Sequence, residues 1–139
     1  MTNGLQEELF DKYPKLFTQK DLTIEQSPMA WGITCGDGWY NILDTLCNRI
    51  TKYIKSNKNV GKEANDDWED IDPENPVQFV QIKEKFGTLR VYINWGDETI
   101  YELIAFAEEM SSVTCEECGA PGELMTQGWY KTCCHTHKN

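Results

Sequence analysis

Residues 80–95 read VQIKEKFGTLRVYINW, and this stretch decides the fold. Apolar and polar residues alternate on both sides of the central Phe86-Gly87-Thr88 segment. A period of two is typical of a strand with one buried face, and a glycine turn between two such runs predicts an antiparallel β-hairpin. The polar face of this hairpin carries three cations and an aromatic ring, namely Lys83, Lys85, Arg90 and Tyr92.

Two amphipathic helices are expected, one on each side of the hairpin. Upstream, apolar residues recur at helical spacing from Trp39 to Ile54, and Asp37 in the preceding turn is a candidate N-cap. Downstream, Thr99 and Glu102 fit a capping box, and a second apolar stripe follows them. These patterns predict an α+β fold in which amphipathic helices pack on a small antiparallel β-sheet.

The N-terminal part of the chain carries weaker patterns. Leu5, Leu9 and Tyr13 recur at helical spacing, which predicts a short helix that ends before Pro14. A short strand is expected over residues 29–35. The core domain is therefore expected to span residues 1–113.

The C-terminal segment, residues 114–139, contains two pairs of metal-binding residue types with the same spacing. Cys115 and Cys118 form a Cys-x-x-Cys pair, and Cys134 and His137 repeat the two-residue gap. Such a spacing lets both side chains of a pair reach one ion, and three thiolates with one imidazole make a closed tetrahedral zinc site. The sequence predicts one structural Zn²⁺ in a zinc-ribbon or knuckle-like finger docked on the core.

Neighbouring residues leave the second ligand pair open. Cys133 could replace Cys134, and His135 could replace His137. The six cysteines could instead form disulfides in a secreted chain, or remain reduced without metal. However, the first ten residues lack the layout of a secretory signal, so a cytoplasmic location and a metal site are favoured. The separate residues Cys35 and Cys47 are expected to be small buried hydrophobic groups.

Half of the formal net charge of −10 lies in residues 56–76, which hold seven acids and two lysines. Asparagine, proline and glycine in this stretch predict a long acidic loop. Trp68 lies among its acids, and it could anchor a basic protein surface together with Asp66, Asp67, Glu69 and Asp70. The alternative is that Trp68 folds back onto the domain.

Composition and motifs also limit the function classes. The acidic balance disfavours a general nucleic-acid binder, although the Lys83, Lys85, Arg90 and Tyr92 face could make a nucleic-acid-associated factor. No uninterrupted apolar run is long enough to cross a bilayer. There is no phosphate loop, no nucleophile elbow and no histidine outside the finger. An enzyme is not expected, even though Asp66 and Asp67 could bind magnesium or act in acid–base chemistry.

Several phrases of the chain carry a family resemblance. They are CGDGWY at 35–40, KEKFGTLR at 83–90, FAEEM at 106–110, CEECGAPG at 115–122 and GWYKT at 128–132, ahead of Cys134 and His137. Together they resemble a group of small bacteriophage and prophage proteins of uncharacterised activity, from about Trp31 onward but without the 56–76 stretch.

The resemblance implies origin in a mobile element and action in a bacterial cytoplasm. It also favours Cys134 and His137 over their neighbours, because the group usually ends with one Cys-x-x-His. The expected function is a non-catalytic protein that binds a host or phage protein, with inhibition of a bacterial defence system as a specific case.

Overall fold

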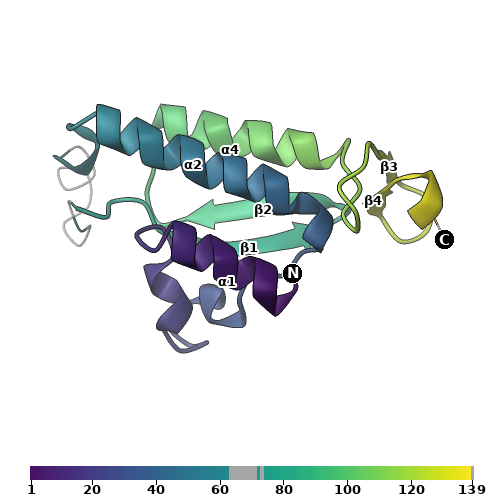
Figure 1. Ribbon diagram of the computed structural model, residues 1–139, viewed down its shortest axis with the longest axis horizontal. Helices are drawn as coiled ribbons and strands as arrows, with labels where there is room; N and C mark the ends of the chain where they lie inside the picture. Colours follow the sequence, from purple (N-terminus) through teal and green to yellow (C-terminus); the bar gives the residue numbers. More distant parts are fainter. Residues whose placement is uncertain (63–71, 73, 139) are drawn as a thin grey trace.

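The computed structural model describes residues 1–62, 72 and 74–138, which form the predicted α+β fold (Figure 1). Two helices pack with an antiparallel hairpin, and a smaller hairpin with the Cys/His cluster lies at one end of the molecule. The main elements are α1 (Asn3–Lys12), α2 (Tyr40–Ser56), β1 (Phe79–Lys85), β2 (Thr88–Ile93), α4 (Glu98–Ser111), β3 (Glu123–Met125) and β4 (Lys131–Cys133). Among the described residues, no helix is both long and apolar enough to cross a membrane.

The β1–β2 hairpin confirms the prediction from its alternating pattern. Its turn is formed by Phe86 and Gly87, which have φ angles of 53° and 87°. Positive φ at both central residues is the geometry of a tight hairpin turn whose twist matches the strands. Ile82 pairs with Val91, and both are buried on the face that meets the helices. The register shifts once between Phe79 and Gln81, so the alternation is imperfect at the start of β1.

Both outer edges of this hairpin have hydrogen-bond partners. On the β2 side, the amides of Leu89 and Val91 donate to Ser111 Oγ and Glu108 Oε2 of α4, each at 2.9 Å. On the β1 side, Thr34 forms a parallel bridge, because its amide donates to Ile82 O and its carbonyl accepts from the Glu84 amide. These four backbone groups are therefore not available to pair with a strand of another chain.

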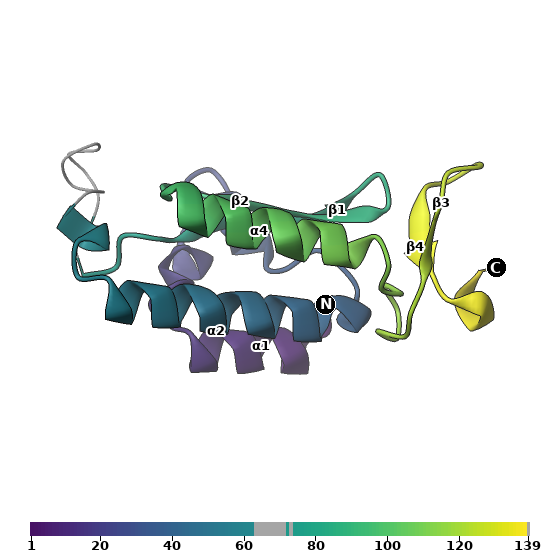
Figure 2. The same cartoon turned by 90° about the horizontal axis from the view of Figure 1, so that it is seen from above.

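Helices α2 and α4 run in opposite directions, side by side (Figure 2). Contacts at both ends fix this arrangement. The indole of Trp39, just before α2, donates to Thr114 O just after α4, at 2.9 Å. At the other end, the Tyr53 hydroxyl donates to the Asp97 carboxylate. The core between these contacts includes fully buried Leu43, Ile50 and Ile100.

Helix α1 is tied to α2 through Asp44. The Asp44 carboxylate accepts from Lys12 Nζ at 2.6 Å and from Tyr13 Oη at 2.7 Å. Burial acts to raise the pKa of Asp44, but the bonds from Lys12 and Tyr13 outweigh it and lower that pKa below its usual value. Burial and the same carboxylate raise the pKa of Tyr13 to about 12.

This contact predicts an acid-dependent loss of stability. A carboxylate whose pKa is lowered by folding stabilises the native state above its unfolded pKa, and this contribution disappears as the pH falls through the folded pKa. We expect Asp44→Asn to be less stable than the wild type at neutral pH, with the difference shrinking below the ordinary value of 3.8. Urea unfolding at several pH values measures it. Asp11→Asn, at an exposed position, is the control, and an equal pH trend in both variants would contradict the assignment.

Three local predictions are wrong. Residues 29–35 do not form a strand, because Pro28–Trp31 is a 3₁₀ turn capped by Ser27 and only Thr34 makes a bridge. Asp37 does not cap a helix, since its carboxylate accepts the amide of Thr2 at 2.7 Å. Helix α4 begins earlier than the Thr99–Glu102 capping box implies, because Asp97 is its N-cap and accepts the Ile100 amide at 2.9 Å.

The acidic stretch is only partly described. Residues 60–62 are helical, which differs from the predicted loop, and Val60 is fully buried in the core. The proposed anchor residues Trp68, Asp66, Asp67, Glu69 and Asp70 lie outside the described residues.

Candidate metal centre

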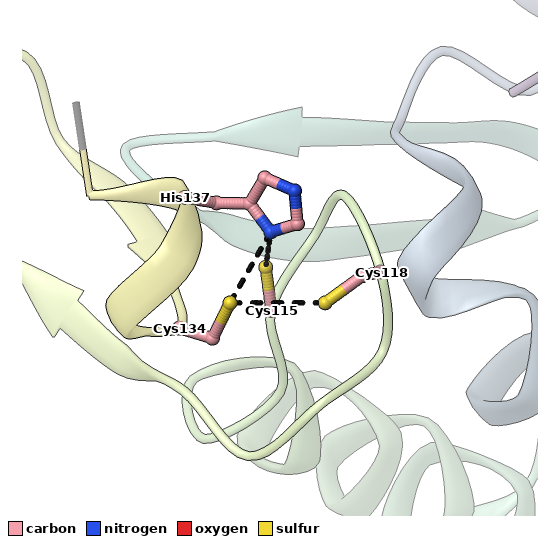
Figure 3. Close-up of side chains that lie close together, drawn as sticks. All are labelled: Cys115, Cys118, Cys134 and His137. Carbon is pink, nitrogen blue, oxygen red and sulfur yellow. Dashed lines mark hydrogen bonds between the residues drawn. The ribbon is translucent and has the colours of Figure 1, made fainter.

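The four predicted ligands lie together at the C-terminal end of the molecule (Figure 3). The sulfurs of Cys115, Cys118 and Cys134 and a ring nitrogen of His137 are all within 4.8 Å of one another. His137 Nδ1 is 3.6 Å from Cys115 Sγ and 3.2 Å from Cys134 Sγ. The sulfurs of Cys118 and Cys134 are 3.8 Å apart.

These separations fit ligands arranged around one metal ion. With bond lengths of about 2.3 Å to sulfur and about 2.0–2.1 Å to nitrogen, a tetrahedron has edges of about 3.8 Å between sulfurs and about 3.6 Å from sulfur to nitrogen. A disulfide would instead require sulfurs about 2.0 Å apart. The four groups therefore lie close enough to bind one metal ion, and all of them come from the same short segment.

Local backbone structure brings the two ligand pairs together. After α4, the chain turns back at the Cys115–Cys118 knuckle, where the Gly119 amide donates to Cys115 O at 2.9 Å. Gly119 has a φ of 80°, a left-handed conformation that favours glycine. The β3–β4 hairpin then returns the chain, and a short 3₁₀ turn over His135–His137 closes the second pair, with the His137 amide donating to Cys134 O at 3.1 Å.

The two ring nitrogens of His137 face different groups. Nδ1 faces the sulfurs, and Nε2 lies 3.4 Å from Glu117 Oε2. Metal-binding histidines commonly donate their other N–H to a carboxylate, which selects the tautomer and the ring orientation. Glu117 is thus a supporting residue that the sequence reasoning missed. The signal in the sequence was the position of this carboxylate between two metal-ligand cysteines, Cys115 and Cys118.

The surroundings of Cys115 and Cys134 favour the thiolate forms that bind metals. The hydrogen bond from the Ala120 amide acts to lower the pKa of Cys118, but burial and the contacts with Cys115 and Cys134 outweigh it and raise that pKa instead. Burial acts to raise the pKa of Cys115, but backbone amides of Cys134, Cys118 and Glu117 outweigh it and lower that pKa to about 6. Burial also opposes ionisation of Cys134, whose pKa is nevertheless lowered by its contact with His137. The pKa of His137 is raised by the same contact. Thiols in such surroundings are poised as ligands, since the thiolate is the metal-binding species.

The structure separates the four ligands from the two neighbours that the sequence left open. Cys133 is buried within β4, opposite Glu123, and does not belong to the cluster. His135 is exposed and also lies outside it. Cys35 and Cys47 are buried as predicted, and burial raises the pKa of both thiols.

The Cys115–Cys118 knuckle packs against the core at Gly36 and Gly38. The Gly38 amide donates to Glu116 O at 2.7 Å, and the Gly36 amide donates to Glu116 Oε2 at 2.9 Å. A Cβ at Gly38 would lie 2.1 Å from Cys115 O, so only glycine permits this approach. A second contact links Thr132 Oγ1 to Gly87 O at the β1–β2 turn, at 2.7 Å. Sequence reasoning took the glycines for turn residues only.

This close backbone contact predicts that adding one methyl group at Gly38 destabilises the protein. Gly38→Ala must push apart two backbone segments, and overpacking of this kind costs about 1–3 kcal/mol of stability. Gly4→Ala is a matched control, since a Cβ there meets no atom within 4 Å. The free energy of unfolding from urea titration should fall for Gly38→Ala and be unchanged or higher for Gly4→Ala. Equal stability of both variants would contradict the close approach.

The residues of the nucleic-acid alternative share one face of the hairpin. Lys83 pairs with Arg90 across the strands, Lys85 pairs with Thr88, and Tyr92 pairs with Gln81. This is the face opposite buried Ile82 and Val91. Lys85 and Tyr92 are exposed, whereas Lys83 and Arg90 are partly buried. The four side chains form a surface separate from the Cys/His cluster.

Comparison of the chain with known protein families, with curated proteins and with solved structures gives no match. The assignment of the site therefore rests on its own geometry, namely three sulfurs and one imidazole nitrogen that all lie within 4.8 Å of one another. The resemblance to phage and prophage proteins stays a prediction.

Proposed function

We propose that Cys115, Cys118, Cys134 and His137 bind one structural Zn²⁺ ion. The observation that supports this most strongly is the donor set, with three sulfurs and one imidazole nitrogen inside 4.8 Å. Thiolate and imidazole ligands suit zinc, and a site filled by four protein ligands leaves no open position for water or substrate. The ion would stabilise the finger rather than take part in a reaction.

Metal titration tests this assignment directly. The chelated protein is titrated with Co²⁺ and then with Zn²⁺, and the visible absorption of the cobalt form reports tetrahedral sulfur ligation. One Co²⁺ per chain, displaced by one Zn²⁺, is the expected result. Octahedral absorption, or binding that Cys118→Ser leaves unchanged, would reject the site. Cys133→Ala is the matched control because that thiol is buried outside the cluster.

We further propose that the protein is a non-catalytic binding protein for a host or phage protein. Supporting this, aromatic side chains project from the finger and from the adjacent hairpin turn. Trp129 is 86% exposed and Phe86 is 65% exposed, and the Phe86 and Tyr130 ring centroids are 6.3 Å apart. Exposed aromatic residues supply most of the binding energy in many protein interfaces.

The net charge of −10 favours a partner with a basic surface. The acids Asp66, Asp67, Glu69 and Asp70 around Trp68 would add to this attraction. Inhibition of a bacterial defence system in the host cytoplasm is the specific case that the phage resemblance suggests. A component of such a system that itself binds nucleic acid would present the required basic surface.

Affinity capture tests this function. The zinc-loaded protein is used as bait in bacterial lysate, next to Trp129→Ala, Trp68→Ala and a variant with amides at 66, 67, 69 and 70. A defined partner whose capture weakens in the amide variant and at higher salt supports the basic-surface proposal. Capture that no variant and no salt concentration changes would exclude both the acidic and the aromatic surfaces.

The second candidate is a nucleic-acid-associated factor, favoured by the shared face of Lys83, Lys85, Arg90 and Tyr92. Such binding weakens steeply with salt, because phosphate contacts release counterions. Fluorescence anisotropy with single- and double-stranded DNA and RNA distinguishes the two candidates. We expect no saturable binding at physiological salt. Salt-dependent binding that Lys85→Glu abolishes would favour the second candidate instead.

A further inference from the structure

An apolar groove runs between α2 and α4 on the surface of the core. Its volume is about 460 Å³. Side chains from both helices line it, chiefly Ile42, Leu46, Leu103, Phe106, Ala107 and Met110. Phe106 is 69% exposed and Met110 is 39% exposed, so the groove continues into an exposed apolar patch on α4. Exposed apolar patches of this kind commonly mark interaction sites.

The two helices are in a fixed antiparallel register. The Trp39–Thr114 and Tyr53–Asp97 contacts hold the two ends, so residue positions on α2 and α4 run past each other in a known order. Arg49 and Leu103 line the same end of the groove. Interpolation between the two end contacts also places Arg49 at the level of Glu102.

The rims of the groove carry opposite charges. On α2, Arg49 lines the groove and the exposed Lys52 follows it by about one helical turn, and both are basic. On α4, the exposed Glu102 and Glu109 lie about one helical turn before and after the groove residue Phe106, and both are acidic. Among the described residues, no ion pair joins any of these four side chains to another. The face is therefore apolar along its middle, positive on one side and negative on the other.

We propose that this face pairs with the same face of a second copy of the chain. With a two-fold axis along the groove, α2 of each copy lies on α4 of its partner, and Arg49 comes to lie opposite Glu102 of the second copy. An axis across the groove would instead place the acidic α4 on α4, with like charges close together. Charge thus selects one arrangement, in which both rims are complementary and Phe106 of each copy is covered.

This pairing is independent of the metal and of the proposed host partner. It uses the helical face of the core, whereas the aromatic residues of the finger lie at the end of the molecule. The net charge of −10 on each copy opposes association, so apolar burial along the groove must supply the driving force. The Arg49–Glu102 contacts would supply register and specificity.

Sedimentation equilibrium of the full zinc-loaded chain tests the proposal. The expected mass is twice 16.1 kDa, and the dimer should dissociate on dilution. Phe106→Glu should give a monomer with an unchanged circular dichroism spectrum, because Phe106 is 69% exposed within one chain. Ile24→Glu, at a residue 53% exposed outside the groove, is the control and should leave the dimer intact.

A charge exchange tests the arrangement itself. Arg49→Glu and Glu102→Arg should each weaken the dimer by about tenfold or more, because every substitution acts twice in a two-fold interface. The double variant should restore dimerisation. A monomer at every concentration, including one that binds a foreign helix in the groove, would overturn the proposal. So would a dimer that Phe106→Glu leaves intact, or one that the double variant fails to restore.

Discussion

Cys115→Ser is expected to abolish stoichiometric metal binding and to unfold the finger. Cys115 is fully buried, and its sulfur lies 3.6 Å from His137 Nδ1 in the cluster. Structural zinc sites supply apparent binding free energies of about 10 kcal/mol or more at neutral pH, and this energy is coupled to folding of the segment that holds the ion. The loss should therefore exceed that of any substitution at the surface of the core.

The measurement combines metal content with local protection. Elemental mass spectrometry should give one zinc per wild-type chain and close to none for Cys115→Ser. Hydrogen exchange should show lost protection in residues 114–138 and retained protection in α2 and α4. Cys133→Ala removes a neighbouring buried thiol and should keep its zinc. Equal zinc content in Cys115→Ser and the wild type would refute the ligand assignment.

Trp39→Ala is expected to give the largest loss of stability within the core. Trp39 is fully buried, and replacing a buried tryptophan by alanine typically costs about 3–5 kcal/mol. The substitution also removes the indole that donates to Thr114 O at 2.9 Å, directly before the first ligand. The contact between the finger and the core should consequently be weakened together with the core itself.

Urea unfolding of the zinc-loaded protein measures this effect. Trp129→Ala is the matched control, because that indole is 86% exposed and should change stability little. Trp39→Phe retains most of the ring volume but not the N–H, so it should lie between the wild type and Trp39→Ala. If Trp39→Ala and Trp129→Ala unfold at the same urea concentration, Trp39 is not the link between core and finger.

Long periodic patterns were enough to predict the α+β fold. The hairpin followed from two alternating runs around Phe86 and Gly87, and helices α2 and α4 followed from apolar stripes. Metal-ligand spacing likewise predicted which groups the chain brings together. Such signals lie in short stretches of sequence, so they can be interpreted without knowledge of the tertiary contacts.

The errors arose where tertiary contacts decide the outcome. Asp97, and not Thr99, caps helix α4. The Asp37 carboxylate accepts the amide of Thr2 and does not cap a helix. The role of Gly38 could not be predicted, because it depends on Glu116, which is distant along the chain. The groove was also not predictable from the sequence, where Met110 looks like an ordinary core residue of an amphipathic helix.

The covered edges of the hairpin have a consequence for how the chain must fold. Ser111 and Glu108 protect the β2 amides only while α4 is docked, and the helix follows the strands in the sequence. A nascent or partly unfolded chain without docked α4 would expose Leu89 and Val91 on an open apolar strand, which is a template for intermolecular β-pairing. Aggregation should therefore begin from species in which α4 has detached, so that rapid docking of this helix protects the newly made protein.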